Sequence, residues 1–239
     1  NLKSSFSFKE FYINEFNPHV YQLWLALIHK PEELIDCYSN LSYSNYYLIR
    51  DFYNYINISK YSSSLEEKAA IFLFLNKHCF NGLIRFNKKG EFNTPKGSYT
   101  KQQKLDKVAL LKLSLRLKDL YKEGSLILTN LDFRDFYNFF PSGELSKSVF
   151  YFDPPYIPKS ETSCFVSYSK EGFSKKDQID LSTIIKDIDL QNSSFLLSQS
   201  NTDLTRELYG SYNMINLKAA RSINSKGSKR SSIEYLIHN

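Results

Sequence analysis

The sequence FDPPY, at residues 152–156, places an acid, two prolines and a tyrosine directly after strand-forming residues. Residues 149–152 are β-branched and aromatic, which favours a buried strand, and the acid and the prolines end it. One interpretation is a rigid polyproline turn with Tyr156 packed beneath it. The other is a ligand site at the carboxyl edge of an α/β sheet, where ligands usually bind. These residues alone do not decide between the two.

The chemistry that the FDPPY segment can support depends on its hydrogen-bond acceptors. The Asp153 carboxylate and the Pro154 carbonyl are neighbouring acceptors, because proline lacks an N–H but keeps its C=O. Two acceptors suit a planar NH2 group, such as the exocyclic amine of adenine, and holding both hydrogens off the ring plane localises the nitrogen lone pair. Tyr156 can stack on the base, a contact worth about 1–3 kcal/mol. Such a site acts by positioning and electrostatics rather than by covalent catalysis.

Glu15 is a second candidate, at the end of a strand expected at residues 10–14. An acid in this place holds ribose hydroxyls in nucleotide-binding α/β folds. Alternatively, it is an acid favoured by the dipole at the start of the following helix. No glycine-rich turn precedes Glu15 in the sequence, and on its own the residue fits the second interpretation better.

Residues 81–99, NGLIRFNKKGEFNTPKGSY, are rich in glycine and basic residues and predict a hairpin flanked by turns. Arg85 is the residue type that reads guanine bidentately. Phe80 beside Asn81 pairs an apolar wedge with an amide, a combination suited to entering a base stack. An ordinary surface hairpin explains the same residues.

Composition limits the class of protein. The 239 residues, 42% hydrophobic, allow one large domain or one domain with an insertion, and the net charge of +6 favours a polyanionic partner. Three scattered cysteines and four histidines predict neither a disulfide framework nor a metal site. No apolar run is long enough to span a bilayer. Together with the scattered cysteines, this leads us to expect an intracellular, reduced protein. The chain starts with Asn1 and its only methionine is Met214, which suggests a fragment or a processed product.

Periodicity predicts the elements around these residues. Helices are expected near residues 20–28, 65–75, 104–121, 175–188 and 202–209, and strands near 10–14, 125–129, 149–152, 194–198, 214–217 and 233–237. Residues 38–64 fit either a polar helical region or an extended loop. Strands alternating with helices in the second half predict a parallel α/β sheet.

The FDPPY motif together with NGLIRFNKKGEFNTPKG resembles the Dam-type DNA adenine-N6 methyltransferases of the alpha class. The stretches YINEFNPHVYQLW and RSINSKGSKRSSIEYLI fit the same pattern, so the resemblance runs from about residue 10 to the end. It implies S-adenosylmethionine as methyl donor and a flipped adenine in a GATC-like duplex as target. It also implies a Rossmann-like methyltransferase sheet, residues 1–36 and 118–239, with an inserted, mostly helical DNA-recognition domain carrying a β-hairpin, residues 37–117.

The resemblance also implies roles for individual residues. The catalytic residues are Asp153, Pro154, Pro155 and Tyr156. The cofactor is held by Glu15 at its ribose, by Asp132 and Phe133 at its adenine, and by Asp153. DNA is contacted by the intercalating Phe80, by Asn81 beside the flipped base, by Leu83, Arg85 and Pro95 at other bases, and by Tyr99.

The implied partner is double-stranded DNA and not a membrane, and the implied setting is the cytoplasm of a bacterium or of a phage host, with a restriction-modification system as one context. The sequence begins where the family's F-x-G-x-G motif ends, so we expect the methionine side of the donor pocket to come from a missing N-terminal segment or a second chain. A catalytically incomplete DNA-binding fragment or subunit is the alternative, although the intact DPPY argues against lost catalysis. A base-amine methyltransferase acting on RNA fits the long hairpin match less well.

Overall fold

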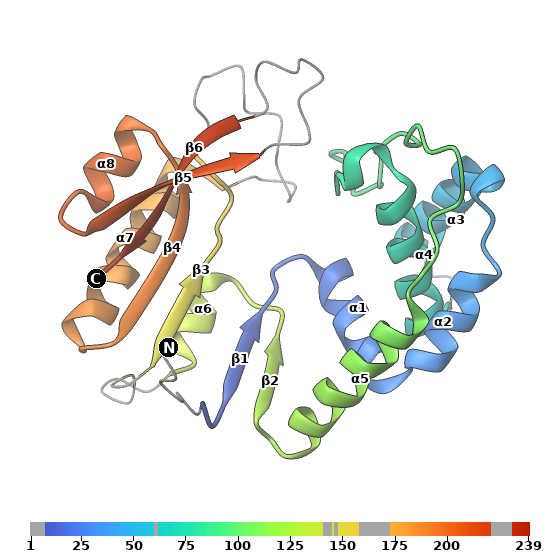
Figure 1. Ribbon diagram of the computed structural model, residues 1–239, viewed down its shortest axis with the longest axis horizontal. Coiled ribbons are helices and arrows are strands. Elements are labelled where there is room, and N and C mark those ends of the chain that lie inside the picture. Colours follow the sequence, from blue (N-terminus) through green and yellow to red (C-terminus); the bar gives the residue numbers. More distant parts are fainter. Residues whose placement is uncertain (1–7, 60–61, 141–144, 146–147, 158–172, 221–230) are drawn as a thin grey trace. The chain divides into compact units, whose positions relative to one another are not determined.

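The computed structural model describes residues 8–59, 62–140, 145, 148–157, 173–220 and 231–239. The chain divides into two compact units, Asn1–Asp132 and Phe133–Asn239. Each unit has a hydrophobic core of its own. The helices and strands of both units are labelled in Figure 1. The predicted division into a catalytic domain and an inserted domain is a functional one and stays a prediction.

The first unit combines a short parallel strand pair with a cluster of helices (Figure 1). Strand β1 (Phe11–Asn14) pairs with β2 (Leu126–Thr129) along its whole length. The Asn14 side chain then ties the ends together, because its amide exchanges hydrogen bonds with both the N–H and the C=O of Leu131. The helices are α1 (Pro18–His29), α2 (Pro31–Ser39), α3 (Tyr46–Ile58), α4 (Leu65–His78) and α5 (Lys107–Lys122).

Two helices of this unit were not settled by periodicity. Helix α3 decides the open choice at residues 38–64 in favour of a helical region. Helix α2 was not predicted, because Pro31 suggests an end to the preceding helix; in the structure it occupies the first position of α2, where its missing N–H costs nothing.

Helix α4 is the centre of the first core. Its residues Ala69–Leu75 include six that are at most 3% exposed, and α1, α2 and α3 all pack against it. Tyr46 and Tyr53 of α3 are buried with them, and each hydroxyl has a hydrogen-bond partner, Thr94 O at 3.0 Å and His19 Nδ1 at 2.8 Å. The core is therefore aromatic, and the polar tips of its tyrosines reach helix α1 at His19 and the loop residue Thr94.

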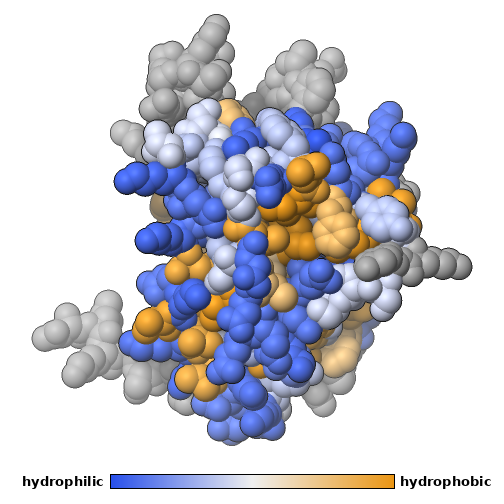
Figure 2. Space-filling view, turned by 90° about the vertical axis from the view of Figure 1, so that its right-hand side faces the viewer, coloured by the Kyte–Doolittle hydropathy of each residue, from blue (hydrophilic) through white to orange (hydrophobic). Residues whose placement is uncertain are grey.

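The outer surface of the first unit is not uniformly polar. Figure 2 shows apolar side chains exposed among hydrophilic ones on one face of the molecule. Leu48, Tyr55 and Ile58 of α3 are each more than half exposed. Within the described residues, no helix combines the length and the apolar character that crossing a membrane requires.

The described part of the second unit carries a four-stranded sheet in the order β3-β4-β6-β5, with β3 (Val149–Phe152), β4 (Ser194–Ser200), β5 (Asn213–Ala220) and β6 (Ser231–His238). Strand β3 runs parallel to β4, but β6 is antiparallel to both β4 and β5. The expected parallel pairing is confirmed for β3 and β4 and is wrong for β6. Residues 221–230 between β5 and β6 are fewer than the dozen or so that a parallel crossover needs, so β6 returns beside β5 in the opposite direction.

Helices α6 (Phe133–Asn138), α7 (Lys175–Leu190) and α8 (Asp203–Tyr209) complete the second unit. Helix α7 begins with a capping box between Ser174 and Asp177, and Arg134 of α6 forms ion pairs with Asp177 and Asp180. The buried core joins the sheet to α7 and α8 through Leu181, Ile185, Ile188, Phe195, Leu197, Tyr209 and Ile237. A mixed α/β architecture is therefore confirmed, while its Rossmann-like detail stays a prediction.

Candidate active site

The DPPY turn, residues 153–157, follows directly after β3. Because β3 and β4 are parallel, the turn and the end of β4 lie at the same sheet edge. Strand β6 is antiparallel to β4, and its Glu234 pairs with Ser200, so the start of β6 lies at this edge as well. The predicted strand at residues 149–152 is confirmed as β3. Polar residues that follow β3, end β4 and begin β6 lie at the carboxyl end of β3.

Tyr156 is held by its hydroxyl. That oxygen lies 2.5 Å from Ser198 Oγ of β4, and it donates to Glu234 Oε2 of β6 over 3.2 Å. The ring is partly buried. Two strands therefore fix the direction of the tyrosine side chain.

Asp153 is exposed, and its pKa is raised above the usual value of an aspartate. Desolvation by the neighbouring groups, and after it the negative charge of Glu234, raise the pKa of Asp153 above its usual value. Burial is also the main cause that raises the pKa of Tyr156. A carboxylate that loses hydration becomes a better hydrogen-bond acceptor for a ligand, which suits the role predicted for Asp153.

The backbone of the turn is held by side chains rather than by a sheet ladder. Gln178 of α7 donates to Pro155 O over 3.0 Å, Gln199 Oε1 accepts from Ile157 N over 2.8 Å, and Ser200 Oγ donates to Ile157 O over 2.5 Å. The sequence reasoning missed these residues. The signal that the sequence offered was the polar run S-Q-S, residues 198–200, at the end of the otherwise apolar strand β4.

The residues predicted to hold the cofactor lie elsewhere in the chain. Glu15 extends β1 and its Oε1 accepts from Asn17 N, the N-cap of α1, over 2.8 Å; desolvation raises its pKa. This contact fits the alternative interpretation of Glu15 as an acid at the start of a helix, and it leaves the second carboxylate oxygen able to accept from a ligand. Asp132 and Phe133 fall at the boundary of the two units, and Phe133 opens α6. Their cofactor roles stay predictions.

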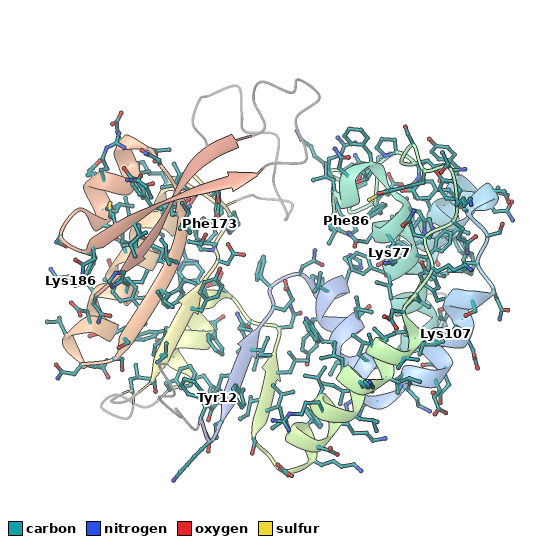
Figure 3. All side chains as sticks on the ribbon, viewed as in Figure 1. Tyr12, Lys77, Phe86, Lys107, Phe173 and Lys186 are labelled. Carbon is teal, nitrogen blue, oxygen red and sulfur yellow. The ribbon has the colours of Figure 1, made fainter. Side chains whose placement is uncertain are left out.

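The predicted hairpin segment, residues 81–99, turns back on itself but forms no regular ladder. Phe86 and Phe92 make an antiparallel bridge, and Asn87 N donates to Glu91 O over 2.9 Å around the turn at Gly90. Phe86, labelled in Figure 3, stacks on His19 with ring centroids 4.5 Å apart. The hairpin is thus confirmed in its course, and it is attached to the aromatic core.

Most of the side chains predicted to reach DNA, in this segment and at Phe80 just before it, are exposed. Phe80 is 42% exposed, and Asn81 has a left-handed backbone (φ 53°) in a 3-10 turn, Phe80–Gly82. Arg85 is exposed, and Asn93 accepts from its Nε and Nη2 through a side-chain oxygen at 2.8 Å and a backbone oxygen at 3.1 Å. Pro95 is exposed, whereas Leu83 and Tyr99 are partly buried. Their contacts with DNA remain predictions.

Comparison with known proteins places these features in one family. The family model of D12 class N6 adenine-specific DNA methyltransferases matches residues 1–223. The Type II methyltransferase M1.LlaDCHI of Lactococcus lactis subsp. cremoris is 34% identical over 94% of this chain and 77% of its own length. The Type II methyltransferase M.MjaIII of Methanocaldococcus jannaschii is 38% identical over 77% of this chain and 60% of its own.

A DNA adenine methylase of Haemophilus influenzae is 29% identical over 97% of this chain and 78% of its own length. These matches cover both units, including the hairpin segment and the DPPY turn. Methyltransferases of this family use S-adenosylmethionine as methyl donor. The chain belongs to the family of D12 class N6 adenine-specific DNA methyltransferases.

Proposed function

We propose that this chain methylates adenine N6 in a GATC-like duplex site after the adenine has been rotated out of the helix, with the DPPY turn as the catalytic segment. The observation that carries the proposal is the arrangement at the end of β3. There an exposed carboxylate, two prolines and a tyrosine with a tethered hydroxyl share the sheet edge with Ser198 and Glu234.

In this proposal Asp153 and the Pro154 carbonyl accept the two hydrogens of the adenine amine. This direction of pull favours a pyramidal nitrogen whose lone pair is no longer shared with the ring. S-adenosylmethionine would supply the methyl group: its sulfonium S–CH3 bond would break as the bond to adenine N6 forms, leaving S-adenosylhomocysteine. The nitrogen gains a positive charge as it is methylated and then loses one proton, and the raised pKa of Asp153 makes its carboxylate a suitable first acceptor for that proton.

Donor binding is assigned to Glu15, Asp132 and Phe133 among the residues of this chain. The fit at Glu15 rests on its carboxylate, which keeps one oxygen engaged by Asn17 and has a second available to a ribose hydroxyl. Desolvation around Glu15 strengthens any hydrogen bond that it accepts. The aromatic ring of Phe133 suits one face of the donor's adenine.

DNA recognition is assigned to the hairpin segment. Phe80 is exposed and Asn81 follows it, so an apolar ring stands beside an amide, the two residue types suited to replacing stacking and pairing when a base leaves the duplex at a cost of a few kcal/mol. Arg85 is oriented by Asn93 and is suited to a guanine edge. The match to DNA adenine methylases across this segment supports duplex DNA rather than RNA.

The test uses the full-length protein, tritium-labelled donor and plasmid DNA that lacks adenine methylation. We expect Asp153→Ala to abolish methyl transfer while DNA affinity stays near that of the unchanged protein. Tyr156→Ala should lose up to about a hundredfold in turnover and Tyr156→Phe much less, because the stacking face contributes about 1–3 kcal/mol. Comparable turnover in Asp153→Ala would show that the turn is not catalytic.

The sequence preference is tested on the same plasmid. Single-molecule mapping of N6-methyladenine should place the modified bases within GATC or a site that contains it. Modification concentrated in an unrelated sequence would refute the GATC assignment while leaving the catalytic assignment intact.

A further inference from the structure

Two buried glutamines form hydrogen bonds to the backbone of the DPPY turn. Gln178, in the first turn of α7, is 3% exposed, and Gln199, near the end of β4, is 0% exposed. Their side chains are joined, because Gln199 Nε2 donates to Gln178 Oε1 over 3.3 Å. Gln178 bonds the backbone of Pro155 and Gln199 bonds that of Ile157. Helix α7 and strand β4 therefore hold the same short segment.

The orientation of both amides is dictated by their partners. The Pro155 carbonyl can only accept, so the atom of Gln178 that faces it is the NH2 nitrogen. The N–H groups of Ile157 and Ser200 can only donate, so both point at the oxygen of Gln199, at 2.8 Å and 2.9 Å. The nitrogen of Gln199 and the oxygen of Gln178 are then left facing each other. The pair has a single arrangement that satisfies every group.

These bonds fall on both sides of Tyr156. The Pro155 carbonyl belongs to the peptide unit before Tyr156, and the Ile157 N–H belongs to the peptide unit after it. Fixing both units leaves the tyrosine backbone little freedom, and Ser198 and Glu234 fix the hydroxyl at the other end. Because two prolines precede Tyr156, no N–H of Pro154 or Pro155 is available to hold the turn by a ladder.

We propose that Gln178 and Gln199 are positioning residues for methyl transfer, which set the plane and height of the Tyr156 ring against the target adenine. The inference rests on the proposed function of the DPPY turn. A stacked base must be held within a fraction of an ångström of the attacking geometry, and a loosened tyrosine would bind the base without presenting its amine correctly. The expected defect is therefore in turnover more than in binding.

The first test replaces each glutamine with methionine, which has a similar volume and no hydrogen-bonding amide. In the full-length protein, Gln178→Met and Gln199→Met should each lower kcat for plasmid DNA at least tenfold, while KM for the plasmid DNA changes less than threefold. Gln191→Met is the matched control: it lies at the other end of α7, bonded to Tyr137 and Asp187, and should leave kcat unchanged. Thermal unfolding of each variant shows whether it is folded.

The second test uses rescue by glutamate. A protonated glutamic acid copies the amide at either position, since its C=O accepts and its O–H donates. The ionised form lacks the donor and places a negative oxygen against Pro155 O at residue 178, or against Gln178 Oε1 at residue 199. The activity of Gln178→Glu and Gln199→Glu relative to the unchanged protein should therefore be near one at low pH and fall as pH rises through the pKa of the introduced carboxyl, which burial raises above about 4.3.

The outcomes separate this inference from the proposed function. If Tyr156→Ala keeps full turnover, the DPPY turn is not the catalytic segment and the proposed function fails first. If Tyr156→Ala is severely impaired while the folded methionine variants keep normal kcat, the proposed function stands and the positioning role is refuted. If the methionine variants do not fold, the folded glutamate variants decide: a relative activity that does not change with pH would equally refute it.

Discussion

The hairpin segment and the DPPY turn are both irregular backbone that carries proposed functional side chains, but they are held in different ways. Helix α3 grips the hairpin through Tyr46, which donates to Thr94 O, and through Asn54, which bonds both the N–H and the C=O of Phe92. The turn is gripped by the buried amides of Gln178 and Gln199. Both segments are thus held by hydrogen bonds from buried side chains, but the hairpin also packs Phe86 and Phe92 into the aromatic core of the first unit.

The difference follows from what each segment presents. The hairpin leaves Phe80, Asn81 and Arg85 exposed, where they can reach a partner that brings its own shape and charge. The turn keeps Tyr156 partly buried and tethered, where small displacements matter for chemistry. Acid, loss of an anchor and loss of a charge should therefore affect the two segments differently.

Acid should produce the largest effect, and it should loosen the hairpin before the turn. Burial, and to a lesser degree Lys68, lower the pKa of His19 from 6.5 to about 4, and burial also lowers the pKa of His78. A histidine kept neutral in the folded state contributes stability above pH 6.5 that is lost as pH falls toward its folded pKa. For His19 this is up to about 3 kcal/mol in the free energy of unfolding.

The single tryptophan, Trp24, packs against the core of the first unit, so its fluorescence during denaturant unfolding measures this loss. His19→Gln should flatten the pH dependence between pH 6.5 and 4. His29→Gln, at an exposed position, should leave it unchanged. An unaltered dependence in His19→Gln would assign the acid sensitivity to other groups.

Removing a hairpin anchor should have the next largest effect. Asn54→Ala leaves the N–H and the C=O of the buried Phe92 without their side-chain partner, which should cost about 2 kcal/mol in the free energy of unfolding. DNA affinity should fall with it, while donor affinity measured by calorimetry should not. Asn57→Ala is the matched control, because the described hydrogen bonds of its amide go to Tyr53 of the same helix and not to the hairpin segment. A fall in donor affinity for Asn54→Ala alone would show that the two segments are not independent.

Arg85→Ala should change specificity by a smaller amount. If Arg85 reads a guanine, its loss should cost about 1–2 kcal/mol on the cognate duplex and relax discrimination at one base pair. Replacing Lys88 and Lys89 by glutamine should instead weaken all duplexes alike and reduce the salt dependence, as expected for phosphate contacts. Competition binding against cognate and scrambled duplexes at two salt concentrations separates the two. Equal weakening of both duplexes by Arg85→Ala would make it a phosphate contact.

The smallest effect is expected at the turn, in the pH profile of methyl transfer. Asp153 must be ionised to accept the amine hydrogens, so kcat should fall as pH drops through its raised pKa. Because the charge of Glu234 contributes to that rise, Glu234→Gln should move this acid limb to lower pH by less than one unit and change kcat at neutral pH less than tenfold. A limb that stays in place would remove Glu234 from the electrostatics of the site.

Local sequence was sufficient for the parts of the site that depend on neighbours in the chain. The strand at residues 149–152, its termination at Asp153 and the return of the hairpin at Gly90 all follow from β-propensity, the missing N–H of proline and turn chemistry. The long match to the family's motifs likewise identified the family from the sequence alone. These features require no contact between distant residues.

The tertiary structure alone decided the rest. Whether residues 46–58 form a helix depended on burying Tyr46, Tyr53 and Ile56 against α4, because their polar neighbours suit a loop equally well. The direction of β6 depended on which strands it joined. Gln178 and Gln199 are ordinary polar letters in the sequence, and they meet at the DPPY turn only because α7 packs on β4, where a buried amide must find partners.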